Sequence, residues 1–176
     1  MDNIKNKIRT VPDFPSPGIM FRDVTTLLMD KDGFKDVINS TANHWKESGV
    51  TKIVGIDARG FIIGGGLAYQ MQLGFVPVRK KGKLPPPTLS QSYTLEYGED
   101  SLEILEQSLT ESDKVLIVDD LIATGGTAEA TVKLVRILGA EVLGCSFIVD
   151  LPDLEGMNKL RAQDVETFAL CAFEGH

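Results

Sequence analysis

The chain has 176 residues, of which 43% are hydrophobic and 24% are charged, and its formal net charge is −7 at pH 7. This composition is that of an average globular protein and excludes disordered and fibrous chains. The negative charge argues against general affinity for nucleic acid or anionic membranes, and no apolar run approaches the ~18 residues that cross a membrane.

The two cysteines, Cys145 and Cys171, lie far apart in apolar segments and form no C-x-x-C pair. Such thiols are typical of the core of a protein in a reducing compartment. The first residues, Met1-Asp2-Asn3-Ile4-Lys5, do not form an apolar signal segment. We therefore expect a cytoplasmic protein, with residues 1–176 in a single domain.

Hydrophobic periodicity predicts strands that alternate with helices along most of the chain. Residues 4–9 are expected to form a short helix ended by Pro12, and residues 12–26 an irregular segment rich in Pro and Gly. Further helices are expected at 27–48, 61–73 and 128–138, and strands at 52–57, 75–79, 93–97, 101–105, 115–118, 141–149 and 165–170. This alternation predicts an α/β fold, a parallel twisted sheet with right-handed crossovers flanked by helices.

The first candidate anion site is Gly55-Ile-Asp-Ala-Arg-Gly60, which ends an expected strand and opens the next helix. The guanidinium of Arg59, together with backbone N–H groups at the helix start, suits a pyrophosphate. The plainer alternative is a turn whose Arg59 faces water. A Walker P-loop motif is absent from the sequence, and Gly64-Gly65-Gly66 is not a Rossmann fingerprint because Tyr69 stands where the third Gly is needed.

The run Arg79-Lys80-Lys81-Gly82-Lys83 puts four cations into five residues of an acidic chain. A solvated loop is the usual explanation for such a run. Here it follows a strand at the same expected sheet edge as the anion site, which favours attraction of a polyanion.

Residues 115–127 carry the strongest functional signal in the sequence. The apolar run Val115–Val118 predicts a buried central strand, and Asp119 and Asp120 follow at the sheet edge where α/β proteins bind ligands. The small residues 123–127 lead into a helix whose N-terminal N–H groups and dipole favour a phosphate. Because two carboxylates would repel that phosphate, they are expected to face a neutral ribose diol. The alternative, that both acids merely cap the helix, does not explain the whole run.

These 13 residues resemble the phosphoribosyl-pyrophosphate signature of type I phosphoribosyltransferases. Residues 55–60 resemble the pyrophosphate loop of the same family, in which a peptide bond near Ala58-Arg59 often adopts the cis form. Many relatives have Ser at the position of Ala58. Residues 79–87 resemble the family's basic loop, except that Pro86 replaces the usual Gly and should stiffen the loop.

Two further segments resemble adenine phosphoribosyltransferases. Residues 93–103 resemble their mobile β-hairpin loop, and residues 14–23 resemble their N-terminal base-binding hood. Together the similar segments cover nearly the whole chain in the right order. The resemblance implies the type I phosphoribosyltransferase fold, with a small hood at about 1–30 and a core at about 31–176.

The resemblance also implies a role for each matching residue. Glu96 and Arg59 would be catalytic, Tyr97 would cover the site, and Phe21 would stack on the purine. Ribose and 5-phosphate would be bound by Asp119, Asp120, Ala123, Thr124, Gly125, Gly126 and Thr127. Pyrophosphate would be bound by Ala58, Arg59, Lys80 and Lys83. Adenine would contact backbone groups of Met20, the hood held in place by Arg22, and the apolar side chains of Phe21, Leu121 and Leu151.

The implied activity transfers the phosphoribosyl group from phosphoribosyl pyrophosphate to adenine, giving AMP and pyrophosphate. Mg²⁺ is the implied cofactor, without dedicated protein ligands, bound mainly through pyrophosphate near Asp119 and Asp120. The implied assembly is a homodimer.

Three alternatives stay open. The first is a related enzyme that acts on xanthine, hypoxanthine or orotate, which should lack this combination of hood and hairpin loop. The second is a phosphoribosyl-pyrophosphate-sensing regulator, which would need a DNA-binding domain and a basic face. The third is a subunit that keeps the fold without turnover, against which intact Arg59, Glu96, Asp119 and Asp120 argue.

Overall fold

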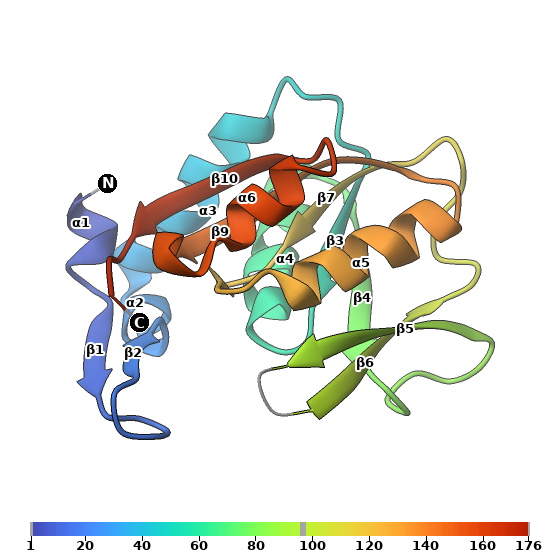
Figure 1. Ribbon diagram of the computed structural model, residues 1–176. Helices are drawn as coiled ribbons and strands as arrows, with labels where there is room; N and C mark the ends of the chain where they lie inside the picture. The colour runs from blue at the N-terminus through green and yellow to red at the C-terminus, as the bar shows by residue number, and fades with distance from the viewer. Residues whose placement is uncertain (1, 96–97, 176) are drawn as a thin grey trace.

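The apolar runs of the sequence become the strands of the main sheet (Figure 1). The computed structural model describes residues 2–95 and 98–175, so Glu96 and Tyr97 lie outside the described residues. Within this part of the chain, a run of five neighbouring strands of the main sheet is parallel, in the order β10 (Glu166–Ala172), β9 (Glu141–Asp150), β7 (Lys114–Val118), β3 (Lys52–Ile56) and β4 (Gly74–Lys80). The predicted parallel sheet is therefore confirmed for its central part.

The sheet continues beyond β4 as an antiparallel hairpin. Its strands are β5 (Thr88–Leu95) and β6 (Gly98–Leu105), and β6 pairs with the end of β4. Both strands are longer than the sequence predicts, because the pairing runs along the whole hairpin from Thr88 and Leu105 to Leu95 and Gly98. The hairpin lies at one edge of the sheet, at the lower right in Figure 1.

Helices cover both faces of the sheet, as Figure 1 shows. The helices α3 (Lys31–Trp45) and α4 (Arg59–Met71) lie on one face, and α5 (Gly126–Ile137) and α6 (Gly156–Arg161) on the other. The side chains of the central strand β7 alternate between the two hydrophobic cores. Val115 and Ile117 pack in the cluster that contains α5, and Leu116 and Val118 pack in the cluster that contains α3 and α4. This two-sided burial explains why β7 reads as a continuous apolar run.

The N-terminal segment differs from the prediction. Its elements are α1 (Asp2–Lys5), the antiparallel pair β1 (Arg9–Pro12) and β2 (Met20–Asp23), and α2 (Thr25–Met29). The expected helix at 4–9 is wrong beyond Lys5, and Pro12 ends a strand instead of a helix. The expected irregular segment 12–26 is wrong for β2 and for the start of α2. Each strand is only four residues long, which is too short for a clear period.

Three short elements were not predicted from the sequence. The 3₁₀ turn η1 (Pro152–Leu154) and the six-residue helix α6 follow β9, whereas the two-residue strand β8 (Leu121–Ile122) lies between β7 and α5 in the sequence and pairs with the end of β9. In the described residues, no helix is long and apolar enough to cross a membrane.

Candidate active site

The predicted phosphate loop, residues 123–127, follows β8 and leads into α5. Gly125 has φ +78°, a left-handed conformation that favours glycine. Within the described part of the chain, no side chain caps the N-terminus of α5, so its first N–H groups are available to an anion. A cavity of about 200 Å³ opens over the loop, lined by Asp119, Leu121, Ile122, Phe147 and residues 123–128.

The two acids at the end of β7 have different surroundings. Asp120 is buried, with 5% of its surface exposed, and its Oδ2 accepts a hydrogen bond from Arg59 Nε. Asp119 is half-buried, lines the phosphate-loop cavity, and accepts from the backbone N–H of Asp120 at 2.9 Å. Burial, and then the charge of Asp120, raises the pKa of Asp119 well above its ordinary value. Asp120 is therefore tied to Arg59, and Asp119 faces the cavity.

The predicted pyrophosphate loop packs directly against these acids. A Cβ placed at Gly60 would lie 2.7 Å from the carbonyl oxygen of Val118 and 3.0 Å from Asp119 Oδ1. Only glycine permits this approach of α4 to the end of β7. The cis peptide bond of this loop joins Asp57 to Ala58, one bond before Ala58-Arg59. Ala58 is exposed at the start of α4 and makes no capping hydrogen bond through its side chain.

The basic loop meets the pyrophosphate loop through Asp57. Its carboxylate accepts from Arg79 Nε at 3.3 Å and lies 3.7 Å from Lys83 Nζ. The side chain of Asp57 is only 7% exposed, whereas that of Lys83 is 51% exposed. Lys83 thus stands beside the pyrophosphate loop with its ammonium open to solvent.

Lys80 points elsewhere in this structure. Its ammonium donates to the hydroxyl of Tyr93 on β5 and to the carboxylate of Asp100 on β6. The Lys80 ammonium also holds the pKa of Asp100 below its usual range. Lys80 therefore joins β4 to the hairpin, and it would have to leave Asp100 to reach a pyrophosphate.

A cavity of about 280 Å³ joins the hood to the pyrophosphate loop, lined by Arg9, Val11, Phe14, Phe21, Asp23, Val24, Thr25 and Arg59. Phe14 and Phe21 meet edge to face, with ring centroids 5.1 Å apart. Arg9 donates to Asp23 at 2.7 Å across the strand pair β1–β2. Arg9 and Val11 could not be predicted from the sequence, because no motif marks them and only the pairing of β1 with β2 brings them to Phe21.

The other predicted base contacts lie in different places. Met20 is exposed at the start of β2 and does not line the hood cavity. Leu121 lines the phosphate-loop cavity, and Leu151 is 9% exposed in the core cluster that contains α3 and α4. Neither leucine lines the hood cavity in this structure.

Arg22 connects the hood to the C-terminal segment, and its role in holding the hood in place for adenine stays a prediction. Its Nη1 donates to Thr10 Oγ1 at 2.7 Å, and its Nη2 donates to the carbonyl oxygens of Glu174 and Gly175 at 3.2 and 3.3 Å. Its guanidinium also lies 4.5 Å from the centroid of the Phe173 ring, a cation–π contact.

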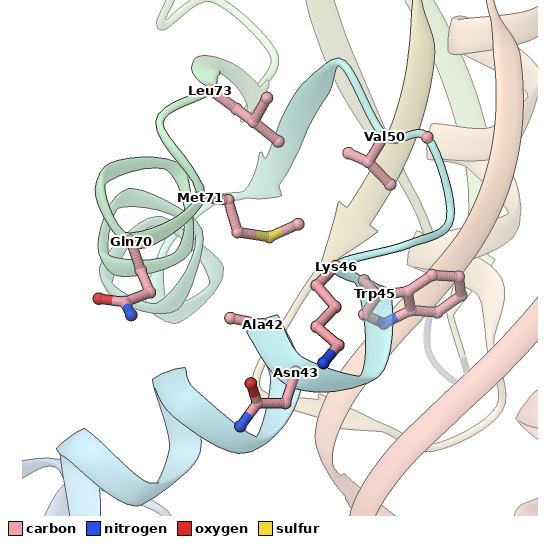
Figure 2. A pocket seen from close by; sticks show the side chains of 9 residues that line it. Ala42, Asn43, Trp45, Lys46, Val50, Gln70, Met71 and Leu73 are labelled. Atoms are coloured by element: carbon pink, nitrogen blue, oxygen red, sulfur yellow. The ribbon is translucent and has the colours of Figure 1, made fainter.

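A further cavity, of about 270 Å³, lies at the opposite end of the strands, beside the residues that precede β3 and β4. Figure 2 shows Trp45 from the end of α3, and Gln70 and Met71 from α4, around it. None of the predicted site residues lines this cavity. In the described residues no group of three or more His, Cys, Asp or Glu side chains is arranged to hold a metal ion.

Comparison with known proteins agrees with this geometry. Residues 25–169 match the family model described as phosphoribosyl transferase domain. The chain is 55% identical over 174 residues to the adenine phosphoribosyltransferase of a Bradyrhizobium species (strain BTAi1), covering 99% of this chain and 97% of the relative.

Solved structures show the same fold. The crystal structure of adenine phosphoribosyltransferase from Rhodothermus marinus has a TM-score of 0.91 at 48% identity, covering 98% of this chain and 97% of that one. The Saccharomyces cerevisiae enzyme, complexed with an imino-altritol bisphosphate and adenine, has a TM-score of 0.92 at 37% identity, with 97% of each chain covered.

Proposed function

The chain belongs to the phosphoribosyl transferase domain family, and on this premise we propose that it is an adenine phosphoribosyltransferase of purine salvage. It transfers the 5-phosphoribosyl group from phosphoribosyl pyrophosphate to N9 of adenine and releases AMP and pyrophosphate. The relatives and solved structures that share its fold over nearly the whole chain carry this activity in their names.

The observation that carries the proposal is the link that Arg59 makes between two cavities. Arg59 lines the hood cavity together with Phe21, and its guanidinium bonds to Asp120. The neighbouring Asp119 lines the phosphate-loop cavity. An aromatic ring for a base, a cation for pyrophosphate, carboxylates for a diol and a helix N-terminus for a phosphate therefore lie close together, one for each part of the two substrates.

The chemistry follows from these groups. Pyrophosphate leaves C1 of the ribose as adenine N9 attacks, and positive charge spreads over C1 and the ring oxygen, as in glycoside cleavage. Arg59 and Lys83 stabilise the leaving anion, and Lys80 joins them once it leaves Asp100. Glu96 holds a proton on the adenine ring as N9 becomes the nucleophile. Tyr97, the next residue in the sequence, covers the site and excludes water, which would otherwise intercept the ribosyl cation.

Mg²⁺ is the cofactor of this proposal. When bound, the ion neutralises the pyrophosphate, and as a hard cation that keeps most of its waters it needs few protein ligands. Asp119 suits a place near it, because its carboxylate lines the phosphate-loop cavity, whereas Asp120 is already paired with Arg59. The free thiols of Cys145 and Cys171 are in keeping with a cytoplasmic location, which stays a prediction.

One face of α4 supports the proposed homodimer. Ile62 is 50% exposed and Tyr69 is 88% exposed, and a Cβ placed at Gly65 between them would meet nothing within 4 Å. These positions share one face of the helix, since they are three and four residues apart. Large apolar side chains gathered in this way are typical of an interface between subunits.

Replacing Tyr69 by Glu is expected to convert the dimer to a monomer, because a charge would be buried at the contact without a partner. Light scattering coupled to size-exclusion chromatography would measure the mass against the 19.2 kDa of one chain. Met29→Glu is the matched control, since Met29 is 80% exposed and lies on a different helix, α2. A wild-type monomer, or a Tyr69→Glu dimer, would contradict the assignment of this interface.

The proposed reaction is tested by incubating the protein with labelled adenine, phosphoribosyl pyrophosphate and Mg²⁺ and following AMP by chromatography. We expect AMP and pyrophosphate in equal amounts. A protein that binds phosphoribosyl pyrophosphate but forms no nucleotide from adenine, hypoxanthine, xanthine or orotate would be a sensor or an inactive subunit, and the proposal would then fail.

A further inference from the structure

The first residue of α6, Gly156, packs directly against the phosphate loop. A Cβ placed at Gly156 would lie 2.2 Å from the carbonyl oxygen of Ala123, 2.7 Å from Ile122 Cγ1 and 2.9 Å from the backbone nitrogen of Gly125. From the other side, a Cβ at Gly125 would lie 3.0 Å from the carbonyl oxygen of Gly156. The two backbones therefore touch without a side chain between them.

Space, and not backbone conformation, requires glycine at position 156. The positive-φ residues of the described chain include Gly125 but not Gly156, which is the first residue of α6. Alanine is favoured over glycine within a helix, so the helix itself would accept a methyl group. Two of the three nearest atoms in its way, Ala123 O and Gly125 N, are backbone atoms of the phosphate loop, which cannot turn aside as a flexible side chain could.

The helix α6 cannot easily retreat from the loop. Its Met157 and Leu160 are buried, at 7% and 0% exposure. Its Lys159 Nζ lies 2.9 Å from Glu129 Oε2 on α5, and Glu129 also pairs with Lys133 at 3.0 Å. Before the helix, the backbone N–H of Leu151 donates to the carbonyl oxygen of Ile122 at 3.1 Å. A side chain at 156 would therefore move the loop and leave α6 in place.

We propose that Gly156 is a positioning residue for the 5-phosphate of phosphoribosyl pyrophosphate, setting the backbone of Ala123–Gly125 so that its N–H groups point at the phosphate. This inference rests on the proposed function of the phosphate loop. Gly156 lines neither the phosphate-loop cavity nor the hood cavity, so it acts through the loop. Its effect should be confined to ligands that carry the 5-phosphate, because Arg59 and the pyrophosphate loop lie on the other side of Asp119.

The test compares two parts of the substrate by calorimetry. In Gly156→Ala, affinity for ribose 5-phosphate is expected to fall by about tenfold or more, the scale of one lost charge-assisted hydrogen bond. Affinity for pyrophosphate with Mg²⁺ should change by less than about twofold, the size of a surface effect. In steady-state kinetics, KM for phosphoribosyl pyrophosphate should rise more than kcat falls.

Gly74→Ala is the matched control, because a Cβ at Gly74 would meet nothing within 4 Å at the start of β4. It should leave both affinities unchanged. A second variant, Gly156→Ala with Glu129→Gln, removes the ion pair between Lys159 and α5, one of the contacts that hold α6 in place, so affinity for ribose 5-phosphate should partly recover.

Unchanged affinity for ribose 5-phosphate in Gly156→Ala overturns the proposal, as does an equal loss of affinity for ribose 5-phosphate and pyrophosphate. The proposal also fails if neither Gly156→Ala nor the double variant folds. The proposed function is judged separately, by AMP formation in the wild-type protein.

Discussion

An Asp119→Asn variant is expected to lose catalytic efficiency and yet to be more stable than the wild-type protein at neutral pH. The loss in kcat/KM for phosphoribosyl pyrophosphate should be about 30-fold or more, because a charged hydrogen bond to the ribose diol contributes about 2 kcal/mol. The gain in stability follows from the raised pKa of Asp119, whose ionised form is disfavoured by burial and by Asp120.

The stability gain should depend on pH in a definite direction. The pKa of Asp in the unfolded chain is about 3.9, and the pKa of Asp119 in the folded protein lies above this value. The wild-type protein therefore loses stability as pH rises from the unfolded pKa to the folded pKa, because the folded state holds the proton more tightly. The difference in Tm between Asp119→Asn and wild type should be small near pH 4 and should grow at higher pH.

Asp120→Asn is the matching variant at the second acid, and it is expected to change stability in the opposite direction. It removes the charge that faces Arg59 Nε, so both catalytic efficiency and stability should fall, the former by a similar factor of about 30. Thermal unfolding across pH and steady-state kinetics on both variants check the pair. Wild-type kinetics in either variant would contradict the role given to that acid, and lower stability of Asp119→Asn at neutral pH would contradict the electrostatic argument.

Replacing Glu96 by Gln is expected to lower kcat by about 100-fold or more, the usual scale for a general acid or base. The substitution keeps size and hydrogen bonding but removes the charge that would hold a proton on the adenine ring. Affinity for phosphoribosyl pyrophosphate should stay close to that of the wild type, because the proposed partner of Glu96 is the base and not the co-substrate. Single-turnover AMP formation and calorimetry of the co-substrate separate the two effects.

Glu106→Gln is the matched control for this prediction, since Glu106 is exposed just after β6, at the far end of the hairpin. It should form AMP at the wild-type rate. If Glu96→Gln also does so, Glu96 is not catalytic, and the mechanism must rest on Tyr97 or on the backbone.

The core of the fold could be predicted because its signals are local. The apolar run Val115–Val118 is long enough to indicate a buried strand, and the small residues that follow it indicate a tight loop before a helix. The same signals place Asp119 and Asp120 at the carboxyl edge of the sheet, where the structure has them.

The remaining features depend on contacts between distant segments. Arg9 reaches Asp23 only because β1 pairs with β2, and Lys80 turns to Asp100 only because β6 pairs with β4. Gly156 stands in no motif, and its importance arises from the loop that packs against it. Short strands, surface cations and packing glycines carry little information in one sequence, because their partners lie far along the chain.

The most direct test of the assignment to adenine is the ratio of kcat/KM for adenine to that for hypoxanthine, measured with saturating phosphoribosyl pyrophosphate and Mg²⁺. In the proposed site, backbone groups of the hood accept from the exocyclic amine of adenine, and a 6-oxo group would leave them unpaired. One unpaired buried polar group costs about 1–3 kcal/mol, so a ratio of about 100 or more is expected. Comparable kcat/KM values for the two bases would contradict the assignment.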